Sequence, residues 1–123
     1  MPDPRRGLGD LGERLAERHL LAKGYRILER NFRIREGEID LIAEVGGTLV
    51  FVEVRARRGA RMGTAIESVT PAKQRRLVAL AEAYGQVRDD LPRDQRIDVI
   101  ALDLSPEGKV LSIEHVEGAV WAE

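Results

Sequence analysis

The chain has 123 residues, of which 43% are hydrophobic and 33% charged, a length and composition that suit one compact domain over residues 1–123. It has no cysteine, which excludes disulfides, thiol catalysis and cysteine-based zinc sites. No apolar run approaches the roughly 20 residues of a membrane span, and the N-terminus lacks the apolar segment of a secretory signal. We therefore expect a cytoplasmic protein that makes no membrane contact.

Charge is unevenly distributed along the chain. Residues 53–81 carry seven basic side chains against two acidic ones, whereas residues 82–123 carry four basic and ten acidic side chains. A local excess of positive charge is typical of a surface that faces phosphates, although a solvated helix and loop would show it too. The side chains that we expect to contact nucleic acid are Arg57, Arg58, Arg61, Arg75 and Arg76.

The N-terminal third predicts a helix followed by a strand. Residues 1–9 are expected to form a loose arm. Asp10 and Glu13 have the spacing of a capping box, which predicts that the helix begins there, and Gly24 is expected to end it. The apolar face of this helix would consist of Leu11, Leu15, His19 and Ala22. Residues 25–34 then favour a strand.

The C-terminal half predicts a second helix and two more strands. Residues 56–69 form a glycine-bearing loop, and Thr70 with Pro71 supplies the N-cap and first residue of a helix. The buried face of that helix would consist of Leu77, Leu80, Ala81 and Tyr84. Residues 96–104 and 110–116 predict strands. The order α-β-β-β-α-β-β predicts an α/β fold, with a mixed central sheet flanked by helices.

Residues 38–55 predict a β-hairpin whose turn is Gly46-Gly47. With this turn, Asp40 faces Glu53 and Ile42 faces Phe51. One face of the hairpin is then entirely apolar and is expected to lie on the core, a set made up of Ile39, Leu41, Ala43, Val45, Val50, Val52 and Val54. A one-residue slip would destroy this segregation, so the pattern specifies the register.

The two opposed carboxylates of the hairpin indicate a metal site. At a separation of about 5 Å and an effective dielectric constant of about 20, two like charges repel by about 3 kcal/mol. A divalent cation between Asp40 and Glu53 would reverse the sign of this term, and Mg²⁺ prefers such oxygen ligands. The alternative is that Arg55 and other basic groups neutralise an exposed acidic patch.

Several short motifs together resemble a known family. G-E-I-D-L-I-A and F-V-E-V-R follow a G-x-x-G-E helix and R-N-F-R, and precede K-Q-R-R-L and R-I-D-V. This set, from about Gly9 to Asp103, resembles the YraN family of uncharacterised bacterial proteins. That family is similar to the PD-(D/E)xK nuclease superfamily, which includes archaeal Holliday-junction resolvases and many restriction endonucleases. The resemblance implies a restriction-endonuclease-like αβββαβ core.

The resemblance also implies roles for individual residues. Asp40, Glu53 and the backbone carbonyl of Val54 would bind Mg²⁺ or Mn²⁺. Glu13 would lie near the metal, although the capping box offers it a purely structural role.

The third motif position of the superfamily is usually lysine but is Arg55 here. Arginine stays protonated, so it can stabilise negative charge but cannot act as a base. Either Arg55 serves in that limited way, or Lys73 on the following helix takes the role of the lysine. The alternative for Lys73 is a side chain that extends along the sheet to solvent.

Four other side chains carry structural expectations. Asp98 is expected to be structural rather than a ligand. His19 should be a hydrogen-bonded side chain at the core edge, and His115 has no acidic partner at a suitable sequence spacing. Trp121 is expected to anchor the C-terminus or to contact a partner.

Three functions remain open from the sequence. The first is a Mg²⁺- or Mn²⁺-dependent endonuclease that cuts DNA, including branched or otherwise structured DNA. The second is a nucleic-acid-binding domain of nuclease fold with weak or no catalysis, and the third is a protein-interaction module. The resolvase analogy alone suggests a homodimer.

Overall fold

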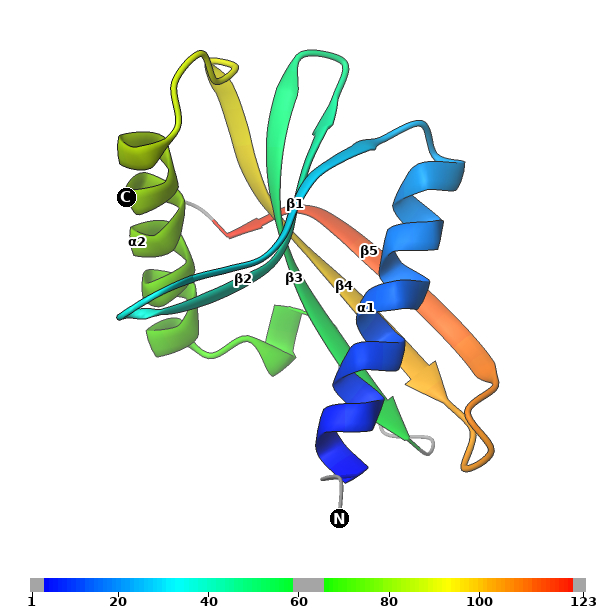
Figure 1. Ribbon diagram of the computed structural model, residues 1–123. Coiled ribbons are helices and arrows are strands. Elements are labelled where there is room, and N and C mark those ends of the chain that lie inside the picture. Colours follow the sequence, from blue (N-terminus) through cyan, green and yellow to red (C-terminus); the bar gives the residue numbers. More distant parts are fainter. Residues whose placement is uncertain (1–3, 59–65, 121–123) are drawn as a thin grey trace.

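A computed structural model describes residues 4–58 and 66–120 of the chain (Figure 1). The elements in chain order are α1 (Pro4–Ala22), β1 (Arg26–Ile34), β2 (Gly37–Val45), β3 (Thr48–Arg58), a short 3-10 helix η1 (Ile66–Ser68), α2 (Pro71–Val87), β4 (Asp94–Leu104) and β5 (Val110–Val120). The strands form one sheet in the order β1-β2-β3-β4-β5, in which only β3 and β4 are parallel. This mixed α/β architecture confirms the predicted order of elements. Among the described residues, no helix is both long and apolar enough to span a membrane.

The hairpin of β2 and β3 has the predicted register. Ile42 pairs with Phe51, and Val45 pairs with Thr48 at the turn. Gly46 and Gly47 both have left-handed φ angles, of 52° and 81°, which a two-residue hairpin turn of this kind requires. The glycine pair therefore sets which side chains face each side of the sheet.

The two helices cover opposite faces of the sheet, and each face has its own core (Figure 1). The α1-side cluster joins Ala16 and Leu20 to strand residues such as Val52. The α2-side cluster contains Leu77, Leu80 and Tyr84 together with Ile42 and Phe51, which are fully buried. The hairpin therefore contributes side chains to a core on each of its faces.

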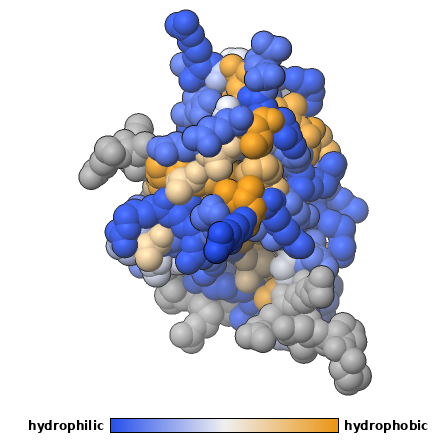
Figure 2. Space-filling view, turned by 60° about the vertical axis from the view of Figure 1, so that its left-hand side comes forward, coloured by the Kyte–Doolittle hydropathy of each residue, from blue (hydrophilic) through white to orange (hydrophobic). Residues whose placement is uncertain are grey.

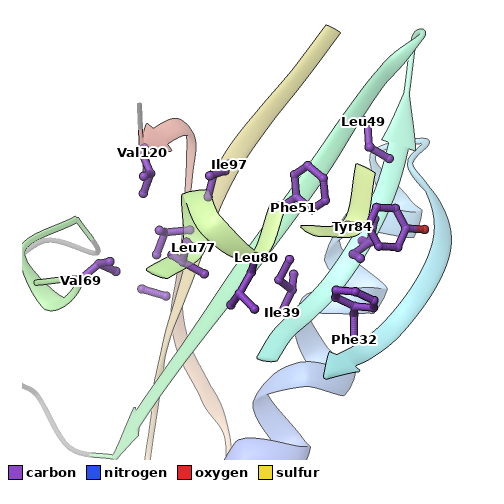
Figure 3. Packing of buried hydrophobic residues seen from close by; sticks show 14 residues of the cluster. Phe32, Ile39, Leu49, Phe51, Val69, Leu77, Leu80, Tyr84, Ile97 and Val120 are labelled. Carbon is purple, nitrogen blue, oxygen red and sulfur yellow. The ribbon is translucent and has the colours of Figure 1, made fainter. Parts of the chain in front are cut away.

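Aromatic packing fixes the far end of α2 against the sheet (Figure 3). Tyr84 lies between Phe32 and Phe51, with ring-centroid distances of 5.0 and 5.7 Å and edge-on geometry in both pairs. Such edge-to-face aromatic pairs stabilise the fold beyond the contribution of burying the rings. They attach the C-terminal part of α2 to β1 and β3.

One residue of the hairpin is not where strict alternation places it. Ile39 packs in the α2-side cluster, not on the face of Leu41, so this part of the predicted apolar face is wrong. The pairing of β2 with β3 runs only as far as Leu41 and Val52. Beyond that point β2 curves away from β3 toward α2 (Figure 1). Ile39 accordingly packs with the α2-side residues.

The first helix is longer than predicted. It begins at Pro4, so the expected loose arm is wrong for residues 4–9, and Asp10 is an interior residue, not an N-cap. Packing explains the extension, because Leu8 and Leu11 both contact the α1-side cluster. The helix ends before Gly24 (φ 88°), as predicted. Its buried centre is Ala16 and Leu20, whereas Ala22 is exposed.

The second helix starts as predicted. The Thr70 side chain accepts a hydrogen bond from the Lys73 amide at 3.2 Å, and Pro71 is the first helical residue. The helix continues through Gly85 and ends at Val87.

A buried polar network joins β4 to β5 on the α1 side. Asp98 is fully buried and accepts hydrogen bonds from Arg96 Nε at 3.0 Å, His115 Nε2 at 2.8 Å and the Gly118 amide at 2.9 Å. Burial raises the pKa of Asp98, but hydrogen bonds from His115, Arg96 and Gly118 outweigh it, so the pKa is lowered. Asp98 is therefore structural, and the expectation that His115 lacks an acidic partner is wrong.

Tertiary packing also determines the contacts of the His19 ring. Its Nε2 is buried and has no hydrogen-bond partner among the described residues, so the expectation of a hydrogen-bonded histidine is wrong for this atom. The ring instead contacts His115 edge-on at 5.7 Å. Trp121 lies outside the described residues.

A close approach of α1 to β3 at Gly12 gives the first prediction. A Cβ at Gly12 would lie 2.7 Å from the Cβ of Ala56, whereas one at Gly7 would meet nothing within 4 Å. We expect Gly12→Ala to lower the free energy of unfolding by about 1–3 kcal/mol through overpacking. The matched variant Gly7→Ala should raise it by up to about 1 kcal/mol through helix propensity. Urea denaturation measures both, and equal stability of the two variants would contradict the close packing.

Candidate metal centre

The site is located where β2 and β3 separate. Asp40 Oδ2 accepts a hydrogen bond from the Val54 amide at 2.8 Å, in place of a backbone carbonyl of β2. The side chain of Asp40 also shares a hydrogen bond with that of Glu53, which is only 6% exposed. The structure thus brings together the two carboxylates that the hairpin register placed opposite one another.

Two further carboxylates join Asp40 from neighbouring segments. Glu13 comes from the middle of α1, and Glu38 precedes Asp40 by two residues on β2. One oxygen each of Glu13, Glu38 and Asp40 lies within 4.8 Å of the others. Sequence reasoning missed Glu38 as a site residue, although its spacing of two from Asp40 in a strand was a usable signal.

An asparagine on β1 connects two of these acids. Asn31 Nδ2 donates to Glu13 Oε1 at 2.8 Å and to Glu38 Oε1 at 2.7 Å. Arg33 Nε donates to the second oxygen of Glu38 at 2.8 Å. Asn31 was not a predicted site residue, although it belongs to the R-N-F-R motif, which was a usable signal.

Two cationic side chains, Lys73 and Arg55, lie close to the carboxylate of Glu53. Lys73 Nζ lies 3.2 Å from Glu53 Oε2, and a guanidinium nitrogen of Arg55 lies 3.6 Å from the same oxygen. The N-cap at Thr70 places Lys73 in the first turn of α2, beside Glu53 in the middle of β3. Both residues that the sequence offered as the third member of the site are therefore close to Glu53.

These side chains surround one hollow, which we call the acidic pocket. Its volume is about 470 Å³, and its walls include Glu13, Asn31, Glu38, Asp40, Glu53 and Lys73. Arg33 and Arg76 also contribute to its wall. A neighbouring hollow of about 430 Å³ shares Asp10, Glu13 and Asn31 with it and is lined by Arg14, Arg18 and Arg30.

Two acids of this pocket, Asp40 and Glu13, have raised pKa values. Burial raises the pKa of Asp40 to about 8, the negative charge of Glu53 adds to the rise, and the Val54 amide opposes it. Burial likewise raises the pKa of Glu13; the hydrogen bond from Asn31 counteracts this, and the charges of Glu38 and Asp10 reinforce it. The protein's own cations therefore do not fully compensate the acids.

The donor set suits a hard divalent ion. Mg²⁺ and Ca²⁺ bind oxygen ligands at about 2.0–2.6 Å, so oxygens on opposite sides of an ion lie roughly 4–5 Å apart. The 4.8 Å limit for the three carboxylates fits that spacing, so these acids could hold a metal ion. Val54 contacts Asp40 through its amide, and its carbonyl remains a predicted ligand.

The predicted basic residues lie in different environments. Arg76 lines the acidic pocket, and Arg58 and Arg75 are exposed. Arg57 Nε lies 3.7 Å from Asp103 Oδ1, so its charge is shared with that carboxylate. Arg61 lies outside the described residues.

A mainly apolar hollow lies elsewhere on the α2-bearing side, where Figure 2 shows apolar surface framed by hydrophilic side chains. Its volume is about 490 Å³, and its apolar lining comes from Phe51, Val78, Ala81, Ile97 and Val120. Among the described residues, it shares no lining side chain with the acidic pocket.

The fold and the pocket define a mixed α/β protein with an acidic site that could hold a metal ion. The model of the uncharacterised protein family UPF0102 matches residues 12–102, and the chain belongs to this family. This membership confirms the resemblance to YraN-like proteins. The matched range contains Glu13, Asp40, Glu53 and Lys73.

Relatives of similar length support the assignment. A UPF0102 protein of Symbiobacterium thermophilum is 51% identical over 105 residues, covering 85% of this chain and 89% of its own. A UPF0102 protein of Roseiflexus castenholzii is 48% identical over 122 residues, covering 98% of each chain.

Among solved structures, Pyrococcus furiosus SfsA in complex with Ca²⁺ matches with a TM-score of 0.37 and 17% identity, over 96% of this chain and 65% of that one.

The raised pKa of Asp40 gives the second prediction. Without divalent ions, the folded protein keeps the Asp40 proton up to a pH of about 8, whereas the unfolded carboxyl, with its ordinary pKa of 3.8, releases it. The contribution of Asp40 to stability is therefore fully present at low pH and is lost as the pH rises toward 8. The slope should be at most about 1.4 kcal/mol per pH unit.

Urea unfolding in EDTA across this pH range tests the slope in the wild type and in Asp40→Asn. The asparagine resembles the protonated acid, so the variant should show a flatter dependence and a higher stability at alkaline pH. An unchanged slope in Asp40→Asn would contradict the assignment.

Proposed function

We propose that the protein is a divalent-metal-dependent endonuclease that hydrolyses phosphodiester bonds of DNA. The observation that carries the proposal is the convergence in one pocket of Asp40, Glu53 and Lys73, the residue types of a PD-(D/E)xK site. The acids Glu13 and Glu38 complete an oxygen-rich wall beside them. The resemblance to YraN-like proteins and their nuclease relatives points to the same chemistry.

In this mechanism, Asp40 with Glu13, Glu38 and Glu53 would hold the metal ion. A metal ion held by these residues would lower the pKa of a bound water and neutralise charge on the phosphate. Lys73 Nζ, 3.2 Å from Glu53, places a positive charge where negative charge develops on the phosphorane oxygens. Lysine can also release a proton, which Arg55 cannot do.

Arginine side chains would hold the sugar-phosphate backbone. Arg76 lies on the wall of the acidic pocket, and Arg14 and Arg18 line the hollow beside it. With aromatic residues at only 4%, recognition by phosphate contacts suits this chain better than base stacking. Such binding is independent of sequence and sensitive to salt.

One observation favours a second candidate, a nucleic-acid-binding domain with weak or no cutting. Arg55 occupies the motif position where related nucleases carry lysine, and it lies 3.6 Å from Glu53. If Lys73 does not replace that lysine, the site binds metal and backbone without efficient turnover.

The third prediction tests the nuclease. Purified protein is incubated with duplex, single-stranded and four-way-junction DNA in Mn²⁺ or Mg²⁺. We expect metal-dependent cleavage that falls at least about 100-fold in Glu53→Gln, because the variant removes a charged ligand. The matched control is Glu107→Gln on an exposed turn, which should cut like the wild type.

Other outcomes distinguish the alternatives. Salt-sensitive DNA binding without cleavage would support the second candidate. Absence of DNA binding even at low salt would contradict both the nuclease and the nucleic-acid-binding domain. A protein-interaction module would then be the remaining function. Cleavage retained in Glu53→Gln would contradict the assignment of Glu53 to the reaction.

The fourth prediction separates the two cations. We expect Lys73→Gln to lower the cleavage rate by about 100- to 1000-fold, as loss of a charge-stabilising donor does. Arg55→Gln should lower it less than about 10-fold, because Arg55 is farther from Glu53 and Lys73 lines the pocket. A large gain of activity in Arg55→Lys would instead show that the wild-type site is impaired.

A further inference from the structure

A single asparagine side chain connects the two acids that come from different elements of the acidic pocket. The carboxamide nitrogen has two N–H groups, and Asn31 uses them on Glu13 of α1 and Glu38 of β2, at 2.8 and 2.7 Å. We propose that Asn31 is the positioning residue of the metal centre. Its amide holds Glu13 and Glu38 in ligand geometry before an ion binds, an inference that rests on the metal centre of the proposed function.

The position of Asn31 in the sheet supports this role. The pairs on either side of it are Arg30 with Leu41 and Phe32 with Ile39, so Asn31 lies across from Asp40. Asp40 in turn contacts Val54 and Glu53 on β3. The Asn31 amide therefore lies on the β1 side of Asp40, whereas Glu53 lies on its β3 side.

A neutral donor suits the space between these two acids. Glu13 and Glu38 bring two like charges close together, and the Asn31 amide donates to an oxygen of each. A carboxamide reduces the repulsion without adding a charge that would compete with a metal ion. An aspartate of the same shape could not donate to either acid when ionised.

The backbone restricts the choice of residue further. Asn31 has a φ of 52°, in the left-handed region that most side chains avoid and that glycine and asparagine tolerate best. Glycine would suit this backbone but has no amide. Asparagine satisfies both the backbone conformation and the two carboxylates.

The left-handed backbone also supplies a matched control. Asp90, between α2 and β4, is exposed and has a φ of 59°. Asn31→Gly and Asp90→Gly therefore make the same backbone change, but only the first removes the amide from the pocket. Because glycine is favoured at both positions, both variants should stay folded, which circular dichroism and urea unfolding check.

The test is Mn²⁺ binding to the full-length metal-free protein, measured by isothermal titration calorimetry and by the electron paramagnetic resonance signal of free Mn²⁺. We expect Asn31→Gly to bind Mn²⁺ about 10- to 100-fold more weakly than the wild type, the usual effect of losing a partner of a metal ligand. Asp90→Gly should bind like the wild type.

A double-mutant cycle separates positioning from a general effect. In a Glu13→Gln/Glu38→Gln background the amide has no carboxylate to hold, so adding Asn31→Gly should change Mn²⁺ affinity less than about twofold. An undiminished effect in that background would overturn the proposal. Wild-type affinity in Asn31→Gly would overturn it as well.

These outcomes differ from failure of the proposed function. A wild-type protein that binds no Mn²⁺ would refute the metal centre itself, and the positioning role with it. Mn²⁺ binding without DNA cleavage would refute only the nuclease, because the effect of Asn31 is measured on the ion.

Discussion

The structure depends on one hydrogen bond, from the Val54 amide to the carboxylate of Asp40. It replaces a backbone contact at the point where β2 leaves β3, so the sheet opens without leaving a buried amide unpaired. The opening lets β2 curve toward α2, turns Ile39 into the α2-side cluster and exposes the acidic pocket. The residue that ends the strand pairing is also the central acid of the site.

Bringing these acids together is unfavourable for folding. Burial of apolar side chains in the two cores offsets that cost. Asp40 and Glu53 carry like charge in a partly desolvated pocket, which is why the pKa of Asp40 is raised. Helix α1, packed closely on β3 at Gly12, contributes Glu13, and α2, fixed at its far end by Tyr84, contributes Lys73. A rigid scaffold with an unfavourable charge cluster is the expected arrangement for a site that binds a cation.

Much of the fold could be predicted because it follows from local patterns. The glycine pair at the hairpin turn and the alternation of side chains specified the register, and Thr70 with Pro71 specified the start of α2. The errors arose where tertiary packing overrides a local signal. Leu8 extends α1 past the apparent capping box, and the neighbouring strand β4 supplies an acidic partner, Asp98, to His115 of β5.

The candidate site likewise combines contacts that follow from local patterns with contacts that follow from tertiary packing. The sequence by itself determined that Asp40 and Glu53 come together, since strand pairing with a period of two is a short-range constraint. Only the tertiary structure decided that Glu13, Asn31 and Lys73 meet them, because those residues reach the pocket through the packing of both helices and β1. Packing between elements depends on shape and burial over the whole chain, which no local spacing encodes.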